Sequence, residues 1–290
     1  MTGPGLFVSG GWNEYELLDC GDGKRLERWG NRVLIRPDPQ AIWPAGDEPE
    51  WEKADAVYHR SPGGGGKWEY IVKTPADWTI RYGVLSFKVH LTGFKHTGLF
   101  PEQAYNWDLI RKILKERSRV SVLNLFGYTG AASVAAAQLG ADVCHVDSSK
   151  GMLSWAKENA ALSGVKEGRI RLIPDDCQKF AEREKRRGKR YDAIIMDPPS
   201  FGRGSKGEVW KLEDNLWRLL SVCSRLLSDT PVFLLVNSYT AGLSPLVVVN
   251  MVQSLDLPRY VLTYGELALP FRHGEMLLPC GLTLFAEFKL

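Results

Sequence analysis

Residues 120–130 read VSVLNLFGYTG, and this stretch decides how the rest of the chain is interpreted. The apolar run 120–125 predicts a buried strand, and Gly127 and Gly130 predict a tight turn after it. Small residues at 131–133 then open a helix. Two glycines alone predict only a strand-turn-helix joint. Doubly wound sheets, however, bind their ligand beyond the carboxyl ends of such strands, where glycines let the backbone approach it closely.

Helices and short apolar strands alternate from about residue 96 onward. The predicted helices span 104–117, 131–139, 150–163, 177–186, 212–227 and 245–255. The predicted strands span 120–125, 142–146, 169–173, 191–196 and 232–237, followed by 264–270 and 282–288 around a Gly/Pro-containing turn. Apolar strands separated by helices predict an α/β fold, a doubly wound parallel sheet covered on both faces. The last two of the seven strands predict a C-terminal antiparallel hairpin.

The first 95 residues have a different composition, which is rich in Gly, Pro and Trp. They contain candidate strands at 15–20, 32–36, 68–73 and 84–91, with Gly-Asp-Gly at 21–23 as a turn. We therefore predict a small β-rich domain over residues 1–95, a candidate for substrate recognition, and a second domain over 96–290.

Composition favours a globular protein of a reducing compartment. The 290 residues are 44% hydrophobic and carry a formal net charge of +3, which permits a nucleic-acid partner without requiring one. No run approaches the ~20 apolar residues of a membrane helix, and the N-terminus does not resemble a secretory signal. These features predict a cytoplasmic protein with no membrane and no metal site. The cysteines are scattered without a CxxC pair, at Cys20, Cys144, Cys177, Cys223 and Cys280.

Three further predicted strands end in carboxylates. Asp147 follows the second strand of the alternating region, and its position suits a carboxylate that accepts both ribose hydroxyls of an adenosine. The next strand ends at Asp175-Asp176, of which we favour Asp176 as the acceptor for the adenine amino group. The strand after that ends at Asp197. Acids at three successive strand ends beside a glycine turn predict an adenosyl cofactor.

Three features indicate S-adenosylmethionine rather than a nicotinamide dinucleotide. The first turn lacks the GxGxxG pattern and shows no phosphate-binding cluster. The element Asp197-Pro198-Pro199 is one that dinucleotide folds do not need. A final antiparallel hairpin also separates the methyltransferase version of this sheet from the dinucleotide version. We therefore expect S-adenosylmethionine as cofactor and S-adenosylhomocysteine as product.

The Asp-Pro-Pro corner predicts the reacting site. Two prolines make a rigid turn and remove two backbone donors, so that the carbonyls and Asp197 can accept bonds from an incoming amine. Methyl transfer then requires that the acceptor be held in line with the methyl group. Ser200 and Phe201 follow at the mouth of the site, where an aromatic ring can stack a base. Packing of Phe201 after the turn is the alternative.

Two basic segments are candidates for phosphate contact. Residues 201–207, FGRGSKG, predict a glycine-rich lid that carries Arg203 and Lys206 as substrate-binding residues, or alternatively a solvated loop. Residues 183–190, REKRRGKR, are interpreted first as a solvated helix end and second as a phosphate-binding patch.

The motifs NLFGYTG (124–130), HVDSSK (145–150) and DPPSFG (197–202) resemble a family of class I S-adenosylmethionine-dependent methyltransferases with a Rossmann-like fold. Characterised members modify large-subunit ribosomal RNA, giving 5-methylcytosine or 7-methylguanine. The segment HTGLFPEQ (96–103) resembles an element that packs beside the cofactor in relatives, and the likeness extends over roughly 84–290. The resulting cofactor set is Phe100, Gln103, Asn124, Phe126, Gly127, Tyr128, Thr129, Gly130, Asp147, Ser148, Asp176, Cys177 and Asp197.

One departure from the family affects the expected chemistry. Members that make 5-methylcytosine attack the base with a cysteine thiolate near the end of strand five, where this chain reads Val236-Asn237-Ser238-Tyr239. Covalent catalysis of this kind needs a thiol of low pKa in the site. We therefore favour direct transfer to a nitrogen. No RNA-binding module of the PUA type is evident, which would leave RNA capture to the N-terminal strands and the basic loops.

The leading hypothesis is a methyltransferase that acts on RNA, ribosomal RNA in particular, with Asp197, Pro198 and Pro199 orienting the acceptor and Phe201 stacking it. Methylation of a protein side chain or a small molecule is one alternative, and a cofactor-binding protein without turnover is another. An RNA enzyme should place Arg203, Lys206 and the 183–190 run on one face with the mouth of the site. The oligomeric state, monomer or dimer, stays open.

Overall fold

The computed structural model describes residues 4–61, 65–203, 207 and 209–289, which form two compact units. The first unit comprises Asn106–Leu267 with stretches at both ends of the chain, and the second comprises Val8–Tyr105 and Ala268–Pro279. The change from one unit to the other therefore lies ten residues after the predicted boundary at 95. The stretch 268–279 groups with the N-terminal unit because Phe271 pairs with Leu17 and the Arg272 N–H donates to the Leu17 carbonyl.

The large sheet has eight strands in the order β1-β16-β17-β15-β12-β9-β10-β11. β9, β10, β11, β12 and β15 are mutually parallel, and β17 runs antiparallel to β15, which confirms the doubly wound sheet with its C-terminal hairpin. The strands are β1 (Gly5–Val8), β9 (Ser121–Leu125), β10 (Asp142–Asp147), β11 (Ile170–Pro174), β12 (Ala193–Met196), β15 (Phe233–Ser238), β16 (Tyr260–Pro270) and β17 (Leu277–Phe288).

The eighth strand, β1, is an addition to the seven that were predicted. It lies at the edge of the sheet beside β16, and the two backbones approach closely at Gly265. A Cβ atom at Gly265 would lie 1.9 Å from the Gly5 carbonyl oxygen, so only glycine fits there. Four residues, GLFV, carry too short a pattern to reveal such an edge strand.

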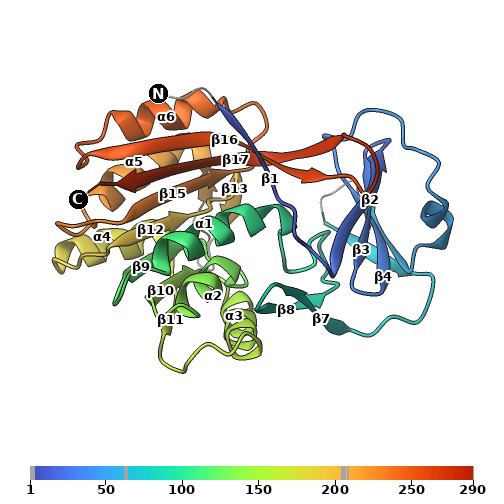
Figure 1. Cartoon of the computed structure of the whole chain (residues 1–290), viewed down its shortest axis with the longest axis horizontal. Coiled ribbons are helices and arrows are strands. Elements are labelled where there is room, and N and C mark those ends of the chain that lie inside the picture. Colours follow the sequence, from blue (N-terminus) through green and yellow to red (C-terminus); the bar gives the residue numbers. More distant parts are fainter. Residues whose placement is uncertain (1–3, 62–64, 204–206, 208, 290) are drawn as a thin grey trace. The chain divides into compact units, whose positions relative to one another are not determined.

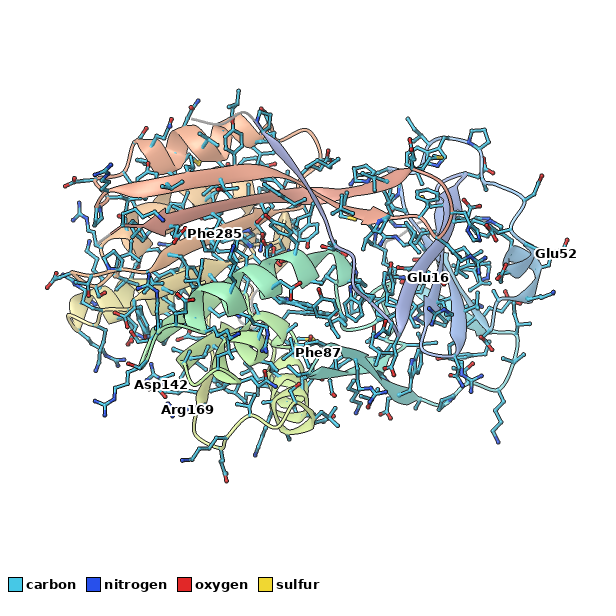
Figure 2. The ribbon with its side chains drawn as sticks, viewed as in Figure 1. Glu16, Glu52, Phe87, Asp142, Arg169 and Phe285 are labelled. Atoms are coloured by element: carbon cyan, nitrogen blue, oxygen red, sulfur yellow. The ribbon has the colours of Figure 1, made fainter. Side chains whose placement is uncertain are left out.

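Helices cover both faces of the sheet (Figure 1). Successive strand residues point to opposite faces, so Leu123 packs with α4, α5 and α6 whereas Val122 packs with α1 and α2. Phe285, labelled in Figure 2, stacks on Phe233 in the second of these layers. The helices are α1 (Ala104–Leu114), α2 (Ala131–Ala137), α3 (Lys150–Leu162), α4 (Cys177–Arg186), α5 (Leu212–Ser224) and α6 (Pro245–Gln253).

The second unit is β-rich, as the sequence predicts. A five-stranded sheet has the order β2-β3-β4-β5-β6, and β7 with β8 forms a separate hairpin. Only the β4–β5 pair is parallel. The elements are β2 (Tyr15–Gly21), β3 (Lys24–Trp29), β4 (Arg32–Pro37), β5 (Ala56–Arg60), β6 (Gly66–Tyr70), β7 (Asp77–Tyr82), β8 (Leu85–His90) and the 3₁₀ turns η1 (Pro49–Lys53) and η2 (Pro101–Gln103).

Strand order locates the ligand edge of the large sheet. The chain moves from β9 outward to β10 and β11, then returns to β12 on the other side of β9. Such a switch point opens a ligand site at the carboxyl ends of β9 and β12. The opposite, amino edge is marked by the ion pair between Asp142 and Arg169 (Figure 2). Within the described ranges, no helix is long and apolar enough to cross a membrane.

Candidate active site

The turn after β9 is strained and heavily supported. Phe126 and Tyr128 have φ values of 57° and 53°, a left-handed conformation that non-glycine residues rarely adopt. The Tyr128 N–H donates to Asp147 Oδ2 at 2.9 Å, and the Gly127 N–H donates to the Val146 carbonyl at 3.1 Å. From α3, Asn159 Nδ2 donates to the Thr129 carbonyl at 2.8 Å. Strain of this kind persists only where the surroundings fix it, as they do at functional sites.

A buried histidine lies beneath this turn and gives the glycines a packing role beside the one expected for them. A Cβ atom at Gly127 would lie 2.3 Å from the His145 ring, and one at Gly130 would lie 2.8 Å from the Ala156 methyl. The absent side chains therefore make room for protein atoms, not only for a ligand. His145 is fully buried, with Nδ1 2.9 Å from Ser133 Oγ. Burial lowers the pKa of His145 to about 4, so the ring is neutral at pH 7.

Asn124 and Thr129, both in the predicted cofactor set, are buried beneath the turn. Asn124 Nδ2 donates to Ser133 Oγ at 2.8 Å, which links β9, α2 and His145 of β10 in one chain of polar contacts. These contacts fix the position of the turn, whereas the partly exposed backbone at 126–128 remains the surface available to a ligand.

Asp147 ends β10 with its carboxylate oriented by two backbone N–H groups. Oδ2 accepts from Tyr128 at 2.9 Å and Oδ1 accepts from Ser149 at 2.9 Å. Burial raises the pKa of Asp147, and the two N–H donors partly offset that rise. Each carboxylate oxygen keeps a second lone pair, so a pair of ribose hydroxyls can still donate to it. Ser148, next in the chain, is exposed.

At the end of β11, the two neighbouring aspartates have different local roles. Asp176 caps α4, with Oδ1 accepting from the Lys179 N–H at 2.8 Å, which leaves Oδ2 for an amino group. Asp175 Oδ1 accepts from the Asp176 N–H and Oδ2 pairs with Arg183. The Asp175 N–H donates to the Asp147 carbonyl at 3.2 Å, so the ends of β10 and β11 lie side by side.

Cys177 is a packing residue of the same edge. Its thiol is fully buried, and the Phe126 N–H donates to Sγ at 3.2 Å. Burial raises the pKa of Cys177, so the sulfur is a thiol rather than a thiolate at pH 7.

The Asp-Pro-Pro corner follows β12 and is tied to a short hairpin, β13 (Phe201–Arg203) with β14 (Val209–Lys211). Trp210 Nε1 donates to the Pro199 carbonyl at 2.7 Å, and its ring lies 4.9 Å from the Phe126 ring. One lone pair of the Pro199 carbonyl is therefore already used, and its expected role towards an acceptor stays a prediction. No donor contacts the Pro198 carbonyl within the described part of the chain.

The same hairpin contains the start of the expected lid, whose residues 204–206 lie outside the described residues, so the lid stays a prediction. Phe201–Arg203 is a paired strand rather than the start of a free loop, and Phe201 is 54% exposed. Ser200 accepts a bond from Thr240 Oγ1 at 2.8 Å and its carbonyl accepts from the Leu212 N–H at 3.1 Å. Lys206 and the side chain of Arg203 lie outside the described residues.

Phe100 and Gln103 belong to the second unit, with Gln103 buried in η2. The Phe100 ring lies 5.2 Å from the His96 ring. Their cofactor contacts stay a prediction.

The donor and acceptor set at the strand ends fits S-adenosylmethionine. Asp147 suits a ribose, Asp176 suits an adenine amino group, and the carboxylates together favour a positively charged sulfonium. Among the described residues there is no group of three His, Cys, Asp or Glu side chains that could hold a metal ion.

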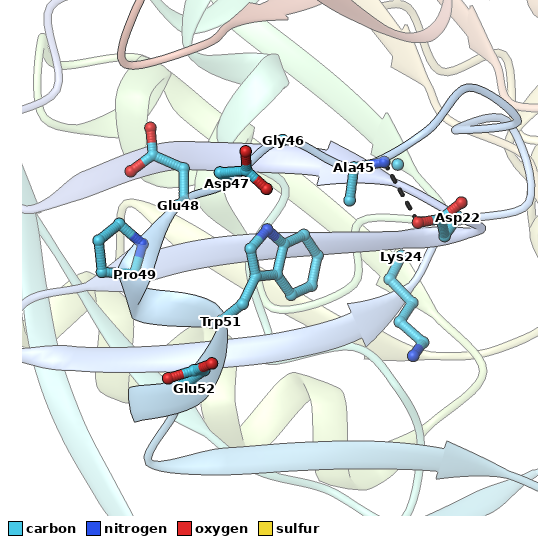
Figure 3. Close-up of a pocket in the computed structure, with 10 residues that line it drawn as sticks. Asp22, Lys24, Ala45, Gly46, Asp47, Glu48, Pro49, Trp51 and Glu52 are labelled. Atoms are coloured by element: carbon cyan, nitrogen blue, oxygen red, sulfur yellow. Dashed lines mark hydrogen bonds between the residues drawn. The ribbon is translucent and has the colours of Figure 1, made fainter.

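A separate pocket lies in the second unit (Figure 3). It has a volume of about 520 Å³ and is lined by Asp22, Asp47, Glu48, Glu52, Lys24 and Trp51, among others. Four of these residues are carboxylates and one is an ammonium, and although Arg272 pairs with Glu48, the remaining excess of negative charge repels phosphates and carboxylates. This pocket is therefore unsuited to the methionine carboxylate of the cofactor or to an RNA backbone.

Several residues that support the site could not be predicted, because the sequence around them shows no pattern that indicates a functional role. His145 sits inside an apolar strand, and Asn159 occupies an unremarkable helix position. Trp210 lies after the glycine-rich segment, and only the hairpin pairing brings it back to Pro199. A tryptophan close behind such a segment was the one available hint.

Comparison with known proteins gives consistent matches. A family model described as S-adenosylmethionine-dependent methyltransferase matches residues 56–284. The ribosomal RNA large subunit methyltransferase K/L of Shewanella baltica is 37% identical over 155 residues, 52% of this chain. The match spans only 21% of that relative, so this chain corresponds to about a fifth of its length.

Two solved structures share the whole fold. The S-adenosylmethionine-dependent methyltransferase from Agrobacterium tumefaciens is 35% identical with a TM-score of 0.94, covering 99% of this chain and 95% of that one. A putative S-adenosylmethionine-dependent methyltransferase from Streptococcus mutans is 20% identical with a TM-score of 0.72, covering 96% and 76%, and shows the fold.

Proposed function

This chain belongs to the S-adenosylmethionine-dependent methyltransferase family, and we propose that it methylates a base of RNA, ribosomal RNA in particular. The observation that carries the proposal is the exposed Phe201 ring directly after the Asp197-Pro198-Pro199 corner. An aromatic face at this place suits a flat base, and base stacking is worth about 1–3 kcal/mol. The similarity to ribosomal RNA large subunit methyltransferase K/L supports this choice of acceptor.

We further propose that the acceptor atom is a nitrogen and that no covalent enzyme intermediate forms. All five cysteines are buried, and burial raises the pKa of Cys144, Cys177 and Cys223. Attack on a cytosine ring carbon needs a thiolate in the site. At the end of β15, Asn237 Oδ1 accepts from Asn106 Nδ2 at 3.0 Å, and the stretch 236–239 contains no cysteine.

The roles of the strand ends follow from their remaining acceptors. S-adenosylmethionine supplies an electrophilic methyl group on a sulfonium. Asp147 would hold its ribose and Asp176 its adenine. The Asp197 carboxylate and the Pro198 carbonyl would accept the N–H bonds of the incoming nitrogen, so that its lone pair points at the methyl group. Asp197 can also take the proton released as the new N–C bond forms.

Trp210 and Thr240 position this corner without touching the acceptor. Trp210 Nε1 donates a hydrogen bond to the Pro199 carbonyl, and Thr240 Oγ1 donates one to the Ser200 hydroxyl. The Pro198 carbonyl is thereby the acceptor that the corner leaves for a substrate. We expect the reaction in the cytoplasm, where ribosomal RNA is made available to such an enzyme.

Methyl transfer to RNA from cells that lack the gene tests the proposal. With radiolabelled cofactor, label should enter ribosomal RNA, and nucleoside analysis should find it on a base nitrogen. Asp197→Asn should lower the transfer rate more than a hundredfold while the dissociation constant for S-adenosylmethionine, measured by calorimetry, stays within about twofold. Asp147→Asn should weaken cofactor binding about tenfold or more.

Asp229→Asn, at an exposed position, serves as the control and should match the wild type in both measurements. Label in protein or small molecules instead of RNA would contradict the RNA assignment. Tight cofactor binding with no transfer to any fraction would favour a binding protein without turnover.

A further inference from the structure

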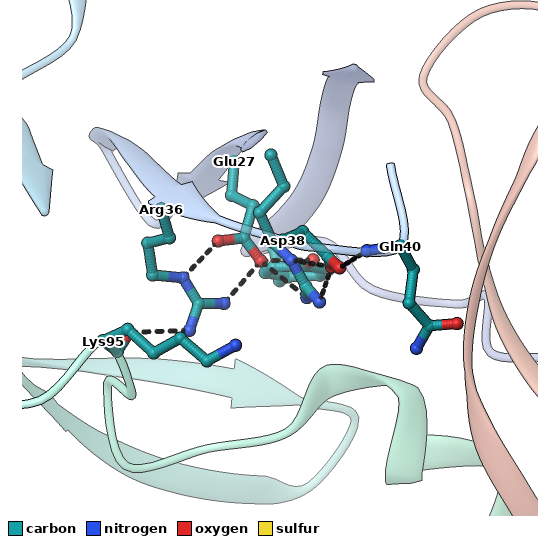
Figure 4. Close-up of polar contacts among 7 residues, drawn as sticks. Glu27, Arg36, Asp38, Gln40 and Lys95 are labelled. Carbon is teal, nitrogen blue, oxygen red and sulfur yellow. Dashed lines mark hydrogen bonds and ion pairs between the residues drawn. The ribbon is translucent and has the colours of Figure 1, made fainter. Parts of the chain in front are cut away.

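A loop in the second unit is held by three consecutive carbonyl groups. Tyr58 Oη of β5 donates to the Gly93 carbonyl at 3.3 Å, and Trp68 Nε1 of β6 donates to the Phe94 carbonyl at 3.3 Å. Arg36 Nη1 of β4 donates to the Lys95 carbonyl at 3.0 Å (Figure 4). Three neighbouring strands thus each donate one hydrogen bond to a three-residue loop.

The backbone of the loop is fixed from within as well. Thr92 Oγ1 donates to the carbonyls of Phe94 and His96, at 3.2 and 3.1 Å, and accepts from the Phe94 N–H at 3.1 Å. With its carbonyls bound, the loop has its conformation set before any ligand arrives. A preset conformation lowers the entropic cost of binding.

The positions of two side chains in this fixed loop are not explained by packing or by ion pairing within the described residues. Phe94 is 65% exposed, unusual for a large apolar ring in so constrained a segment. Lys95 is partly buried, and among the described residues its ammonium forms no ion pair with a carboxylate. A partly buried, unpaired cation beside an exposed ring is costly unless something binds there.

The charges around Lys95 are predominantly positive. Arg36 is paired with the fully buried Glu27 at 2.6 Å, and Arg25 is paired with Asp38. Both arginines thus contact carboxylates, whereas Lys95 has no ion-pair partner among the described residues. Burial, together with Arg25, Arg36 and Arg60, lowers the pKa of Lys95, and Asp38 only partly opposes them. Glu102, another buried carboxyl of this unit, has a pKa that is raised by its burial.

We propose that Phe94 and Lys95 form an RNA contact on the second unit, in which the ring stacks a base and the ammonium binds an adjacent phosphate. The proposal rests on the proposed function, since it assigns residues of the second unit that would bind the RNA substrate. Base stacking on an exposed aromatic beside a cation is the usual way to bind single-stranded nucleic acid without reading its sequence. A phosphate would also supply the negative charge that Lys95 lacks.

The hydrogen bonds to the loop carbonyls also have a purely structural explanation. The experiment must distinguish that explanation from RNA binding. The three bonded carbonyls directly precede the segment 96–103, so they could serve only to position that segment. This explanation accounts for Tyr58, Trp68 and Arg36 but gives no reason for an exposed ring or an unpaired ammonium. Changes confined to the side chains of Phe94 and Lys95 leave the carbonyl bonds in place.

The experiment measures binding of the full-length protein to a fluorescent single-stranded RNA oligonucleotide of mixed sequence across a series of salt concentrations. Phe94→Ala should weaken binding about tenfold at every salt concentration. Lys95→Ala should weaken binding and reduce the slope of log affinity against log salt by about 0.7, the contribution of one phosphate contact in a single strand. The dissociation constant for S-adenosylmethionine and the unfolding midpoint should match the wild type.

Ile42→Ala and Lys53→Ala change an exposed apolar side chain and an exposed cation elsewhere in the same unit, and they should bind RNA as the wild type does. Wild-type affinity and slope in both loop variants would overturn the assignment while leaving the proposed function intact. Weaker cofactor binding with unchanged RNA binding would assign Lys95 to the methionine carboxylate and also overturn it. A wild-type protein that binds no RNA would refute both proposals.

Discussion

His145 shows at the scale of one residue how the cofactor turn is supported. Its ring fills the space that Gly127 leaves, and it is linked through Ser133 to Asn124. Burial is the largest cause of the lowered pKa of His145, because a charged imidazolium here would lose its hydration. The turn therefore packs against a neutral histidine ring. Protonation of this ring at low pH would destabilise the fold.

The pH dependence of this effect follows from the pKa values. Burial holds the pKa of folded His145 near 4, against 6.5 for an unburied histidine. Between these values the unfolded chain binds a proton that the folded chain does not, so the stability present above pH 6.5 is lost as pH falls towards 4. The full effect is about 3 kcal/mol. His145→Gln should be less stable at pH 7 but should lose less free energy of unfolding between pH 6.5 and 4.5, as measured by urea titration.

His273→Gln, at an exposed position, is the matched control and should reproduce the slope of the wild type. An identical pH slope in His145→Gln and the wild type would show that His145 titrates in the folded protein as it does in the unfolded one.

Single-residue patterns in the sequence could predict the acids of the site but not their supports. Asp147, Asp176 and Asp197 are predictable because each follows an apolar strand, and parallel strands bring their carboxyl ends to one edge. His145 and Asn159 lie inside regular elements, where only the folded arrangement brings them beneath or beside the turn. Asp176 combines a predicted ligand role with a helix cap that spacing alone also predicts.

At the scale of elements, the β13–β14 hairpin is the part of the site that depends most on one side chain. Trp210→Phe removes the bond to the Pro199 carbonyl but keeps an aromatic ring near Phe126. A bond of this kind is worth about 0.5–1.5 kcal/mol. We therefore expect kcat/KM for RNA to fall about fivefold, with cofactor affinity unchanged, in steady-state assays of methyl transfer.

The control for this prediction is Trp217→Phe in α5, a partly exposed tryptophan away from the corner, which should keep the wild-type kcat/KM. Equal rates in Trp210→Phe and the wild type would mean that the Pro199 carbonyl needs no partner for turnover.

Elements differ in how far their sequence predicts them. α4 matches its predicted bounds, because Asp176 caps it and the basic residues at its end suit the helix dipole. β3 was missed because its sequence, KRLERW, is mostly charged; Glu27 is nevertheless fully buried through its bonds to Tyr15 and Arg36. A buried ion pair reverses the hydrophobic pattern on which strand prediction depends.

At the scale of the whole molecule, chain order and compact units do not coincide. The sequence suggests a first domain that ends at residue 95, yet the second unit also requires 96–105 and 268–279. Arg272 in the latter stretch pairs with Glu48 and Glu50, more than two hundred positions away in the chain. A change of composition along the sequence can mark a domain boundary. It cannot show that residues 268–279, at the tip of the β16–β17 hairpin, belong to the second unit.

The distribution of basic residues over the molecule yields the last prediction. The run 183–190 was expected on one face with the mouth of the site if it bound RNA. α4 starts at the carboxyl edge and runs ten residues, about 15 Å, towards the amino edge of the sheet. Arg183 reaches back to pair with Asp175 at the carboxyl edge, whereas the run from Lys185 onward lies towards the far end. That distance is about two Debye lengths at physiological salt, so these charges act only weakly on RNA held at the strand ends.

Three cations of the run, Lys185, Arg186 and Lys189, are exposed and form no ion pair within the described chain, which makes their removal structurally mild. The variant with all three replaced by alanine should keep kcat/KM for RNA within about twofold of the wild type at 0.15 M salt, the ionic strength of the screening estimate. A fall of tenfold or more would instead place the RNA backbone along α4. Such a substrate would have to span both edges of the sheet, which implies an extended RNA rather than a single flipped base.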